Sequence, residues 1–178
     1  TAQLIAMGAS VTAVEQSQSR LKRLQSNLAR LGLTADCVLA NLMDFAPEQP
    51  FDAVLLDAPC SSTGTMRRHP DVAWTKGPAD IAKLAELQEK LLRHALTLVS
   101  SGGIVVFSNC SLDPLEGEDM VERVLADTPH CRRVPIAPSD WSGLEEAITP
   151  RGEFRTTPAM LADVGGLDGF YACVIAKI

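Results

Sequence analysis

The sequence predicts an α/β fold, in which short apolar strands alternate with amphipathic helices around a mostly parallel sheet. Two apolar runs of strand length, "FDAVLL" and "IVVFSN", contain β-branched and aromatic residues. Between them, "IAKLAELQEKLLRHAL" repeats its apolar residues at helical spacing. With 178 residues, 46% of them hydrophobic and 21% charged, the chain is long enough to bury one core, and we expect a single domain.

The first part of the chain contains two predicted helices and two predicted strands. Residues 1–8, "TAQLIAMG", predict a helix that ends at its glycine. Residues 10–15, "SVTAVE", predict a short buried strand. The leucines of residues 21–31 recur at the spacing of a helix that ends at Gly32, and residues 36–40, "DCVLA", predict the second strand.

The middle of the chain continues this alternation around one long loop. Residues 51–58, "FDAVLLDA", are apolar enough for a strand that is buried on both faces. Proline and glycine are frequent in residues 58–79, which excludes regular structure there and predicts a functional loop. A helix over residues 81–95, a strand over residues 104–110 and a helix over residues 113–127 follow.

The last third of the chain is less regular. Residues 135–158 are rich in proline and polar side chains, and residues 168–178, "DGFYACVIAKI", predict a terminal strand. No internal repeat or linker suggests a second domain.

Composition and charge exclude several classes of protein. The net charge of −6 and the pI near 5.0 argue against a chain that binds nucleic acid through a broad basic face. Five cysteines without a CxxC pair and three scattered histidines predict reduced thiols and no metal site. The sequence contains no GxGxxG or P-loop motif. Because it also contains no apolar run of membrane-spanning length and no signal peptide, we expect a cytoplasmic protein.

Polar residues follow four of the predicted strands. They are Glu15, Asn41, the stretch from Asp57 to Cys60, and the stretch from Ser108 to Cys110. Ligands of open α/β sheets bind beyond the carboxyl ends of the strands, so we expect these residues to meet at one edge. An acid such as Glu15 can bind the ribose hydroxyls of a nucleotide-like cofactor, although a solvated acid is the more common explanation.

Cys60 and Cys110 each follow a predicted strand and have small polar neighbours, which favours partial exposure. One such cysteine alone is more often structural, but two at the same edge favour chemistry. A thiolate that adds to C6 of a pyrimidine, while an acid supports protonation at N3, makes C5 able to attack a methyl sulfonium. A second thiol can then assist release of the product.

Four stretches together resemble the bacterial Sun/Fmu-type RNA (cytosine-5)-methyltransferases. They are "LLDAPCSSTG", "RRHPDVAW", "VFSNCSLDPLEGED" and "DGFYACVIAK", in family order along essentially the whole chain. The resemblance implies a catalytic domain over residues 1–178 with the Rossmann-like class I S-adenosylmethionine-dependent methyltransferase fold and an antiparallel C-terminal strand. It also implies methylation of C5 of cytosine in RNA, 16S ribosomal RNA rather than transfer RNA, through a covalent cysteine–C6 adduct.

The resemblance also implies roles for individual residues. Cys110 corresponds to the family's nucleophile, Cys60 to the thiol that assists release, and Asp57 to the acid at the N3 edge of cytosine. The implied cofactor-binding residues are Glu15, Asn41, Asp44, Asp57 and Pro59, where Asp44 is the alternative to Asn41 at the adenine. The implied RNA-binding residues are Arg67, Arg68, His69 and Trp74, although Trp74 packed against the core is an equally good interpretation of that loop.

The chain departs from the family pattern at Asn109, where threonine is usual, and at Gly117, where asparagine is usual. We expect the family's first strand and glycine-rich cofactor loop to precede Thr1, and a further N-terminal domain to supply much of the RNA affinity. Without that loop we expect weak cofactor binding. Two other functions stay open: a non-catalytic RNA-binding or ribosome-assembly factor, and a DNA cytosine-5 methyltransferase whose nucleophile would be Cys60.

Overall fold

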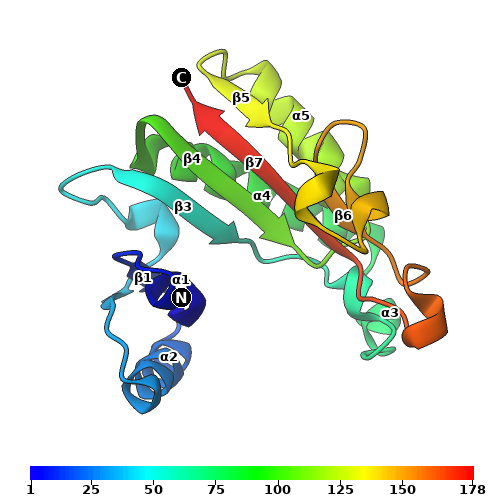
Figure 1. Ribbon diagram of the computed structural model, residues 1–178, viewed down its shortest axis with the longest axis horizontal. Coiled ribbons are helices and arrows are strands. Elements are labelled where there is room, and N and C mark those ends of the chain that lie inside the picture. Colours follow the sequence, from blue (N-terminus) through cyan, green and yellow to red (C-terminus); the bar gives the residue numbers. More distant parts are fainter. The chain divides into compact units, whose positions relative to one another are not determined.

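The computed structural model describes all 178 residues, which form two compact units, Thr1–Pro47 and Glu48–Ile178. Helices and strands alternate along both units (Figure 1). This alternation agrees with the α/β class that the sequence predicts.

The first unit is built around one parallel strand pair. Its elements are α1 (Ala2–Ala6), β1 (Thr12–Glu15), α2 (Gln18–Leu31), β2 (Asp36–Leu39) and the 3₁₀ turn η1 (Leu42–Asp44). β1 and β2 pair in parallel, with Glu15 opposite Leu39. The Ser17 hydroxyl accepts a hydrogen bond from the Arg20 amide at the start of α2, and Gly32, with φ of 67°, ends the helix in the left-handed conformation.

The second unit contains a five-stranded sheet and three helices. Its helices and strands are β3 (Phe51–Asp57), α3 (Val72–Thr75), α4 (Pro78–Leu98), β4 (Val99–Asn109), α5 (Glu118–Ala126), β5 (Cys131–Val134), β6 (Phe154–Thr156) and β7 (Phe170–Lys177). Its 3₁₀ turns are η2 (Thr63–Thr65), η3 (Pro114–Glu116), η4 (Pro138–Asp140), η5 (Glu145–Ala147) and η6 (Ala162–Val164).

The sheet of the second unit has the order β3-β4-β7-β5, and β6 also pairs with β7. β3 is parallel to β4, whereas β7 is antiparallel to β4, β5 and β6. Only the C-terminal strand therefore runs against the other four, which confirms the mostly parallel sheet with an antiparallel C-terminal strand.

The core of the second unit lies between this sheet and the helices α4 and α5, which pack on one of its faces (Figure 1). α4 starts with Pro78, whose missing amide proton costs nothing in a first helical turn, and the Gly77 amide donates to the Asp80 carboxylate at 3.0 Å. The largest fully buried apolar side chains are Tyr171, Phe107, Leu92, Met120, Ile175, Val99, Val105, Val121 and Val124.

Three details of the sequence prediction are wrong. β3 is not buried on both faces, because it pairs only with β4 and leaves Ala53 and Leu55 exposed. β1 is only half-buried throughout, since its one partner is the short strand β2. The loop over residues 58–79 does contain regular structure, η2 and the four-residue helix α3, which fit between its glycines and prolines.

Candidate active site

Cys60 and Cys110 lie side by side beyond the carboxyl ends of β3 and β4. Their Sγ atoms are 3.4 Å apart, although 50 residues separate them along the chain. The parallel register places Asp57 opposite Ser108, and the Ala58 amide donates to the Ser108 carbonyl at 2.9 Å. Because β3 and β4 end together, both cysteine loops reach the same edge of the sheet.

The two thiols differ in acidity. The hydrogen bond from Cys60 lowers the pKa of Cys110 to about 6, helped by the Ser62 hydroxyl at 3.6 Å and opposed by burial and by the charge of Asp57. The same hydrogen bond, together with burial, raises the pKa of Cys60. This arrangement favours a thiolate on Cys110, with Cys60 as its hydrogen-bond donor.

Asp57 supplies an acid next to the two thiols. It is the last residue of β3, and partial burial raises the pKa of its carboxyl although part of the side chain reaches solvent. Its charge acts on Cys110, which places both groups in one site. A carboxyl group that keeps its proton can donate a hydrogen bond, whereas an ionised one only accepts.

Gly64 allows the loop after Cys60 to pass directly against Cys110. Its amide donates to the Cys110 carbonyl at 2.9 Å, and its carbonyl accepts from the Gly169 amide at 2.8 Å. A Cβ atom at this position would lie 2.7 Å from the Cys110 carbonyl oxygen, and it would also overlap the carbonyl of Gly169. Only glycine therefore fits between these two backbones.

The arginines of the predicted RNA-binding segment are paired with an acid. Arg68 Nε donates to both carboxylate oxygens of Asp168, at 3.1 and 2.8 Å. Arg67 Nη2 lies 3.5 Å from the same carboxylate. These contacts with Asp168 raise the pKa of the Arg68 guanidinium.

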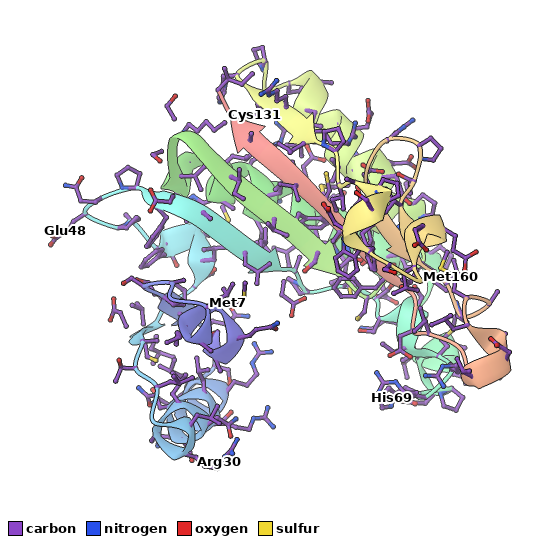
Figure 2. The ribbon with its side chains drawn as sticks, viewed as in Figure 1. Met7, Arg30, Glu48, His69, Cys131 and Met160 are labelled. Atoms are coloured by element: carbon purple, nitrogen blue, oxygen red, sulfur yellow. The ribbon has the colours of Figure 1, made fainter.

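The aromatic residue of the same segment faces solvent. Trp74, in α3, is 90% exposed, which rules out the alternative that it packs against the core. His69 lies at the outer end of the loop (Figure 2). An exposed indole ring in the same loop segment as two arginines is suited to stacking on an unpaired base.

Residues 1–176 match the family model described as 16S rRNA methyltransferase RsmB/F. The chain belongs to this family. Ribosomal RNA small subunit methyltransferase B of Pseudomonas syringae pv. tomato is 40% identical over 171 residues, which are 94% of this chain and 37% of that protein. Its counterpart in Vibrio cholerae is 36% identical over 170 residues, again 94% of this chain and 36% of that protein. The chain spans little more than a third of the length of these relatives.

Solved structures show the same fold. A methyltransferase homolog protein from Pyrococcus horikoshii has a TM-score of 0.76 and 27% sequence identity, over 99% of this chain and 56% of that one. NSun6 from the same organism, solved with SFG, has a TM-score of 0.77 over 99% of this chain and 43% of that one, and its 23% identity supports the fold alone. The Rossmann-like class I methyltransferase fold that the resemblance implied is thus confirmed.

Three residues that the RsmB/F resemblance assigns to the cofactor lie in the first unit. Glu15 ends β1, and its Oε1 accepts hydrogen bonds from the Ser17 amide and the Arg20 guanidinium, both at 2.8 Å. Asn41 caps η1, the turn that contains Asp44. The cysteines belong to the second unit, so the expected convergence of both groups on one sheet edge stays a prediction.

The two departures from the RsmB/F pattern have structural roles. The buried Asn109 donates to the Glu116 carbonyl at 2.6 Å and accepts from the Ser111 amide at 2.9 Å. Gly117 makes room for Arg155, because a Cβ atom there would lie 2.7 Å from the Arg155 Nη2. Arg155 in turn donates to the Ser111 carbonyl at 2.5 Å. Both departures therefore support the loop that carries Cys110.

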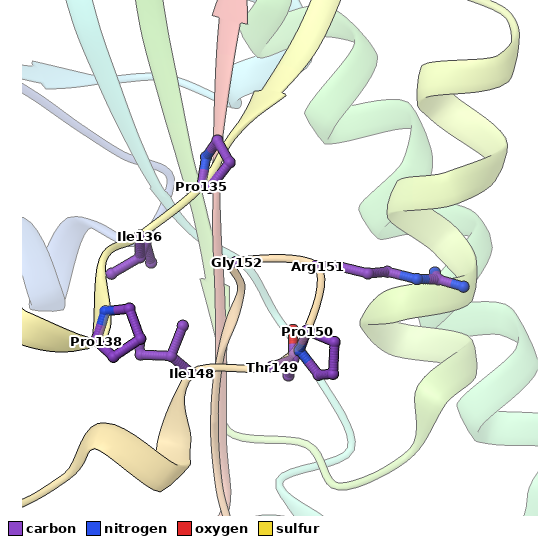
Figure 3. Close-up of a pocket in the computed structure, with 8 residues that line it drawn as sticks. All are labelled: Pro135, Ile136, Pro138, Ile148, Thr149, Pro150, Arg151 and Gly152. Atoms are coloured by element: carbon purple, nitrogen blue, oxygen red, sulfur yellow. The ribbon is translucent and has the colours of Figure 1, made fainter.

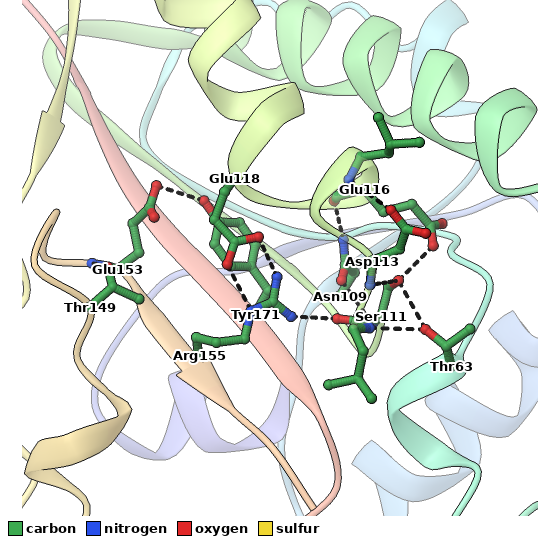
Figure 4. Close-up of polar contacts among 12 residues, drawn as sticks. Thr63, Asn109, Ser111, Asp113, Glu116, Glu118, Thr149, Glu153, Arg155 and Tyr171 are labelled. Atoms are coloured by element: carbon green, nitrogen blue, oxygen red, sulfur yellow. Dashed lines mark hydrogen bonds and ion pairs between the residues drawn. The ribbon is translucent and has the colours of Figure 1, made fainter.

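Sequence reasoning missed a buried polar cluster beside the cysteine loops (Figure 4). Its centre is Glu116, a fully buried acid in η3, which accepts a hydrogen bond from the Ser111 hydroxyl at 2.6 Å. Gln88 of α4 donates to Glu116 at 2.8 Å. The only signal in the sequence was the position of Glu116 inside the motif "CSLDPLEGED", where an acid among polar residues suggests solvated surface.

A groove away from the cysteines offers little chemistry. A groove of about 450 Å³ contains none of the predicted site residues, and its one charged side chain, Arg151, pairs with Glu122 at 3.2 Å (Figure 3). Histidine, cysteine, aspartate and glutamate side chains nowhere gather in a group of three or more that could hold a metal ion. None of the helices combines the length and the apolar character that crossing a membrane requires.

Proposed function

We propose that this chain supplies the reacting groups of an RNA (cytosine-5)-methyltransferase, which transfers a methyl group from S-adenosylmethionine to C5 of cytosine in 16S ribosomal RNA. The observation that carries the proposal is the 3.4 Å contact between Cys60 and Cys110, in which one thiol is acidified and the other is not. Two such unequal thiols suit an attack by one sulfur and a release assisted by the other. Membership of the RsmB/F family supports RNA as the substrate class.

Cys110 acts as the nucleophile. Its thiolate forms a bond to C6 of cytosine, the C5–C6 π electrons form a C4–C5 double bond, and the electrons of the C4–N3 double bond take a proton at N3. Asp57 donates that proton, a role for which its raised pKa suits it. The C4–C5 π electrons would then form the bond from C5 to the methyl group, while the sulfur that carried it keeps the electrons of the broken S–C bond. C4 and the protonated N3 again share a double bond.

Cys60 acts in the release of the product. While Cys110 is a thiolate, the hydrogen bond between the two sulfurs and burial keep Cys60 protonated. Once the Cys110 sulfur is bonded to carbon, that hydrogen bond and charge are gone, so Cys60 loses its proton more easily. As a thiolate it takes the proton from C5. The C5–H electrons restore the C5–C6 double bond, the S–C6 electrons return to Cys110, and N3 returns its proton to Asp57.

The first unit contains groups that fit S-adenosylmethionine, which supplies an electrophilic methyl group when bound. Both hydrogen bonds of the Glu15 carboxylate go to Oε1, which leaves Oε2 for the ribose hydroxyls. We expect Asn41 or Asp44 to contact the adenine; in the second unit, Asp57 and Pro59 stay predicted cofactor-binding residues. Membership of the RsmB/F methyltransferase family supports a cofactor site of this kind.

The RNA would reach the cysteines along the loop that follows Cys60. We propose that Arg67 and Arg68 contact phosphate groups and that Trp74 stacks on a base, with His69 beside them. The target cytosine must be single-stranded or flipped out of its helix to reach the two sulfurs. The names of the relatives favour small-subunit ribosomal RNA over transfer RNA, and the net charge of −6 favours a further RNA-binding region in the complete protein.

Two alternatives are less well supported by the site. A non-catalytic RNA-binding factor has no use for a thiol whose pKa is lowered to about 6. A DNA cytosine-5 methyltransferase would use Cys60 as its nucleophile, but here the pKa of Cys60 is raised. The presence of a second thiol, Cys110, at 3.4 Å from Cys60 and membership of the RsmB/F family favour the RNA enzyme.

The test is methylation of RNA by the complete gene product. Wild type and the variants Cys110→Ala and Cys60→Ala are incubated with S-adenosylmethionine and 16S ribosomal RNA that lacks modifications, and 5-methylcytidine is measured by nucleoside mass spectrometry. Cys131→Ala, a buried cysteine of β5, is the matched control. We expect product from wild type and the control, none from Cys110→Ala, and RNA trapped covalently on Cys60→Ala.

Other outcomes would favour the alternatives. RNA binding without methylation by any variant would support the non-catalytic factor. Methylation of DNA that survives Cys110→Ala but not Cys60→Ala would support the DNA enzyme. Equal losses in all three cysteine variants would point to a general effect on folding and would contradict the assigned roles.

A further inference from the structure

The proposed chemistry requires the Cys60 and Cys110 sulfurs to stay in contact, although the two residues lie on different loops. Both cysteines are half-buried rather than packed in the core. Ser62, in the loop after Cys60, has a φ of 60°, a backbone conformation that residues with a side chain rarely adopt. Loops of this kind move unless the surrounding structure holds them. Hydrogen bonds to the neighbours of the two cysteines provide that support.

Glu116 binds both loops at once. One of its carboxylate oxygens accepts from the Ser61 amide at 2.9 Å, and the other accepts from the Ser61 hydroxyl and, at 2.6 Å, from the Ser111 hydroxyl. Ser61 follows Cys60 and Ser111 follows Cys110, so a single carboxylate fixes the residue after each cysteine. Figure 4 shows its bond to Ser111.

The residues before the two cysteines are tied to the same cluster. Gln88 Nε2 donates to the Pro59 carbonyl and to Glu116 Oε1, both at 2.8 Å. Asn109 donates to the backbone carbonyl of Glu116 at 2.6 Å. All four chain neighbours of the cysteines, Pro59, Ser61, Asn109 and Ser111, are therefore bonded to Glu116 or Gln88.

The contacts of the Glu116 carboxylate are hydrogen bonds from neutral groups and include no ion pair. It is fully buried, all of its side-chain partners are neutral donors, and no lysine or arginine pairs with it. A buried acid without a cation contributes little to stability for its own sake, but its two oxygens can accept from several donors at once. A glutamine in its place would turn an N–H group toward groups that already donate.

We propose that Glu116 is a positioning residue of the methyl transfer, which holds the Cys60 thiol against the Cys110 sulfur by clamping the residues that follow each of them. The inference rests on the proposed function, because it assigns Glu116 to that reaction. Glu116 does not touch the substrate in this role. It acts by keeping the 3.4 Å contact between the sulfurs short.

A charge effect and a positioning effect of Glu116 have opposite signs, which makes the proposal testable. If Glu116 acted on Cys110 only as a nearby negative charge, its removal would favour the thiolate and lower the pKa of Cys110. If it acts by positioning, its removal separates the sulfurs, Cys110 loses its donor, and the pKa rises. The direction in which the pKa of Cys110 moves when Glu116 is replaced therefore distinguishes a charge effect from a positioning effect.

The experiment compares Glu116→Gln with Glu153→Gln in the complete gene product. Glu153 is also fully buried, but its carboxylate accepts from the Tyr171 hydroxyl at 2.8 Å and pairs with Arg133 at 3.0 Å, and it bonds neither residue that follows a site cysteine. The rate at which iodoacetamide alkylates Cys110 is followed against pH by peptide mass spectrometry. We expect the midpoint to rise by about one pH unit in Glu116→Gln and not to move in Glu153→Gln. We also expect kcat for methylation to fall about 10- to 100-fold while KM for RNA is unchanged.

A second variant keeps the proposal testable if Glu116→Gln does not fold. Gln88→Leu keeps a similar volume but removes the donor to Pro59 and Glu116, and we expect a smaller upward shift of the same midpoint. A midpoint that falls or stays fixed in folded Glu116→Gln would overturn the proposal. So would equal shifts in Glu116→Gln and Glu153→Gln. Because alkylation does not depend on methyl transfer, failure of wild type to methylate RNA would refute the proposed function and leave this readout intact.

Discussion

At the scale of single residues, the environment of each thiol decides its acidity. Cys110 has two hydrogen-bonding neighbours, Cys60 and Ser62, whose contacts lower its pKa to about 6. Cys131, in β5, is the opposite case, because burial raises its pKa. The pKa values of Cys110 and Cys131 therefore lie on opposite sides of the ordinary cysteine pKa, and the reactivity of the two thiols at neutral pH should differ accordingly.

We expect alkylation of Cys110 by iodoacetamide to accelerate as the pH rises through about 6 and to level off above it, because the thiolate is the reactive form and a lowered pKa forms it at lower pH. Cys60→Ala removes the main donor, so the midpoint should move up by about one unit or more. Cys131 should react slowly at neutral pH. Mass spectrometry of the labelled peptides gives all three rates, and a wild-type midpoint near the ordinary value of about 8.5 would contradict the assignment.

At the scale of elements, the three-residue strand β6 supports the loop after Cys110. Its middle residue, Arg155, donates to the Ser111 carbonyl at 2.5 Å and to the Glu118 carboxylate at 2.9 Å. The guanidinium also lies 4.8 Å from the centre of the Tyr171 ring. This side chain is only 13% exposed, so its planar fork joins β6, β7 and α5 in a partly dehydrated place.

Arg155→Lys should lower the free energy of unfolding by about 1–3 kcal/mol, because lysine keeps the charge but cannot form the fork or stack on the ring. Arg151→Lys is the matched control, since Arg151 is 55% exposed and makes a single ion pair with Glu122. Its effect should stay within about 0.5 kcal/mol. Urea denaturation measures both values. Equal effects in the two variants would show that the geometry of the Arg155 fork does not matter.

Local pattern predicted the elements that have strong local signals. The apolar runs of β3 and β4 and the leucine spacing of α2 and α4 were sufficient to place these elements. β5 and β6 were missed because they have four and three residues, and both depend on pairing with β7 at the far end of the sequence. The exposure of β3 was also missed, because an apolar run does not indicate whether a neighbour covers it.

The same distinction applies to the candidate site. Cys60, Cys110 and Asp57 were found because each follows a recognisable strand and lies in a motif. Glu116 and Arg155 were not found, because their roles depend on burial and on contacts with residues far away in the sequence. Single-sequence reasoning therefore located the reacting groups and missed the groups that hold them.

At the scale of the whole molecule, a net charge of −6 opposes the approach of RNA, so binding must depend on local positive charge. The best local cluster, Arg67 and Arg68, is occupied by the carboxylate of Asp168. That carboxylate takes the place that a phosphate oxygen would take, since both present acceptor oxygens to a guanidinium fork. The protein therefore holds the two arginines that we propose for phosphate binding against one of its own acids.

Asp168→Asn should increase the affinity for RNA about 2- to 10-fold, because it frees both arginines for phosphate, and it should steepen the dependence of log Kd on log salt concentration by about one unit. Asp163→Asn is the matched control: Asp163 is exposed in the neighbouring turn η6, so its replacement changes the net charge by the same amount without touching the arginines. Filter binding at several salt concentrations measures both. If the two variants gain affinity equally, the net charge of the whole molecule rather than the local cluster limits RNA binding. That result would contradict the proposed role of Arg67 and Arg68 in phosphate binding.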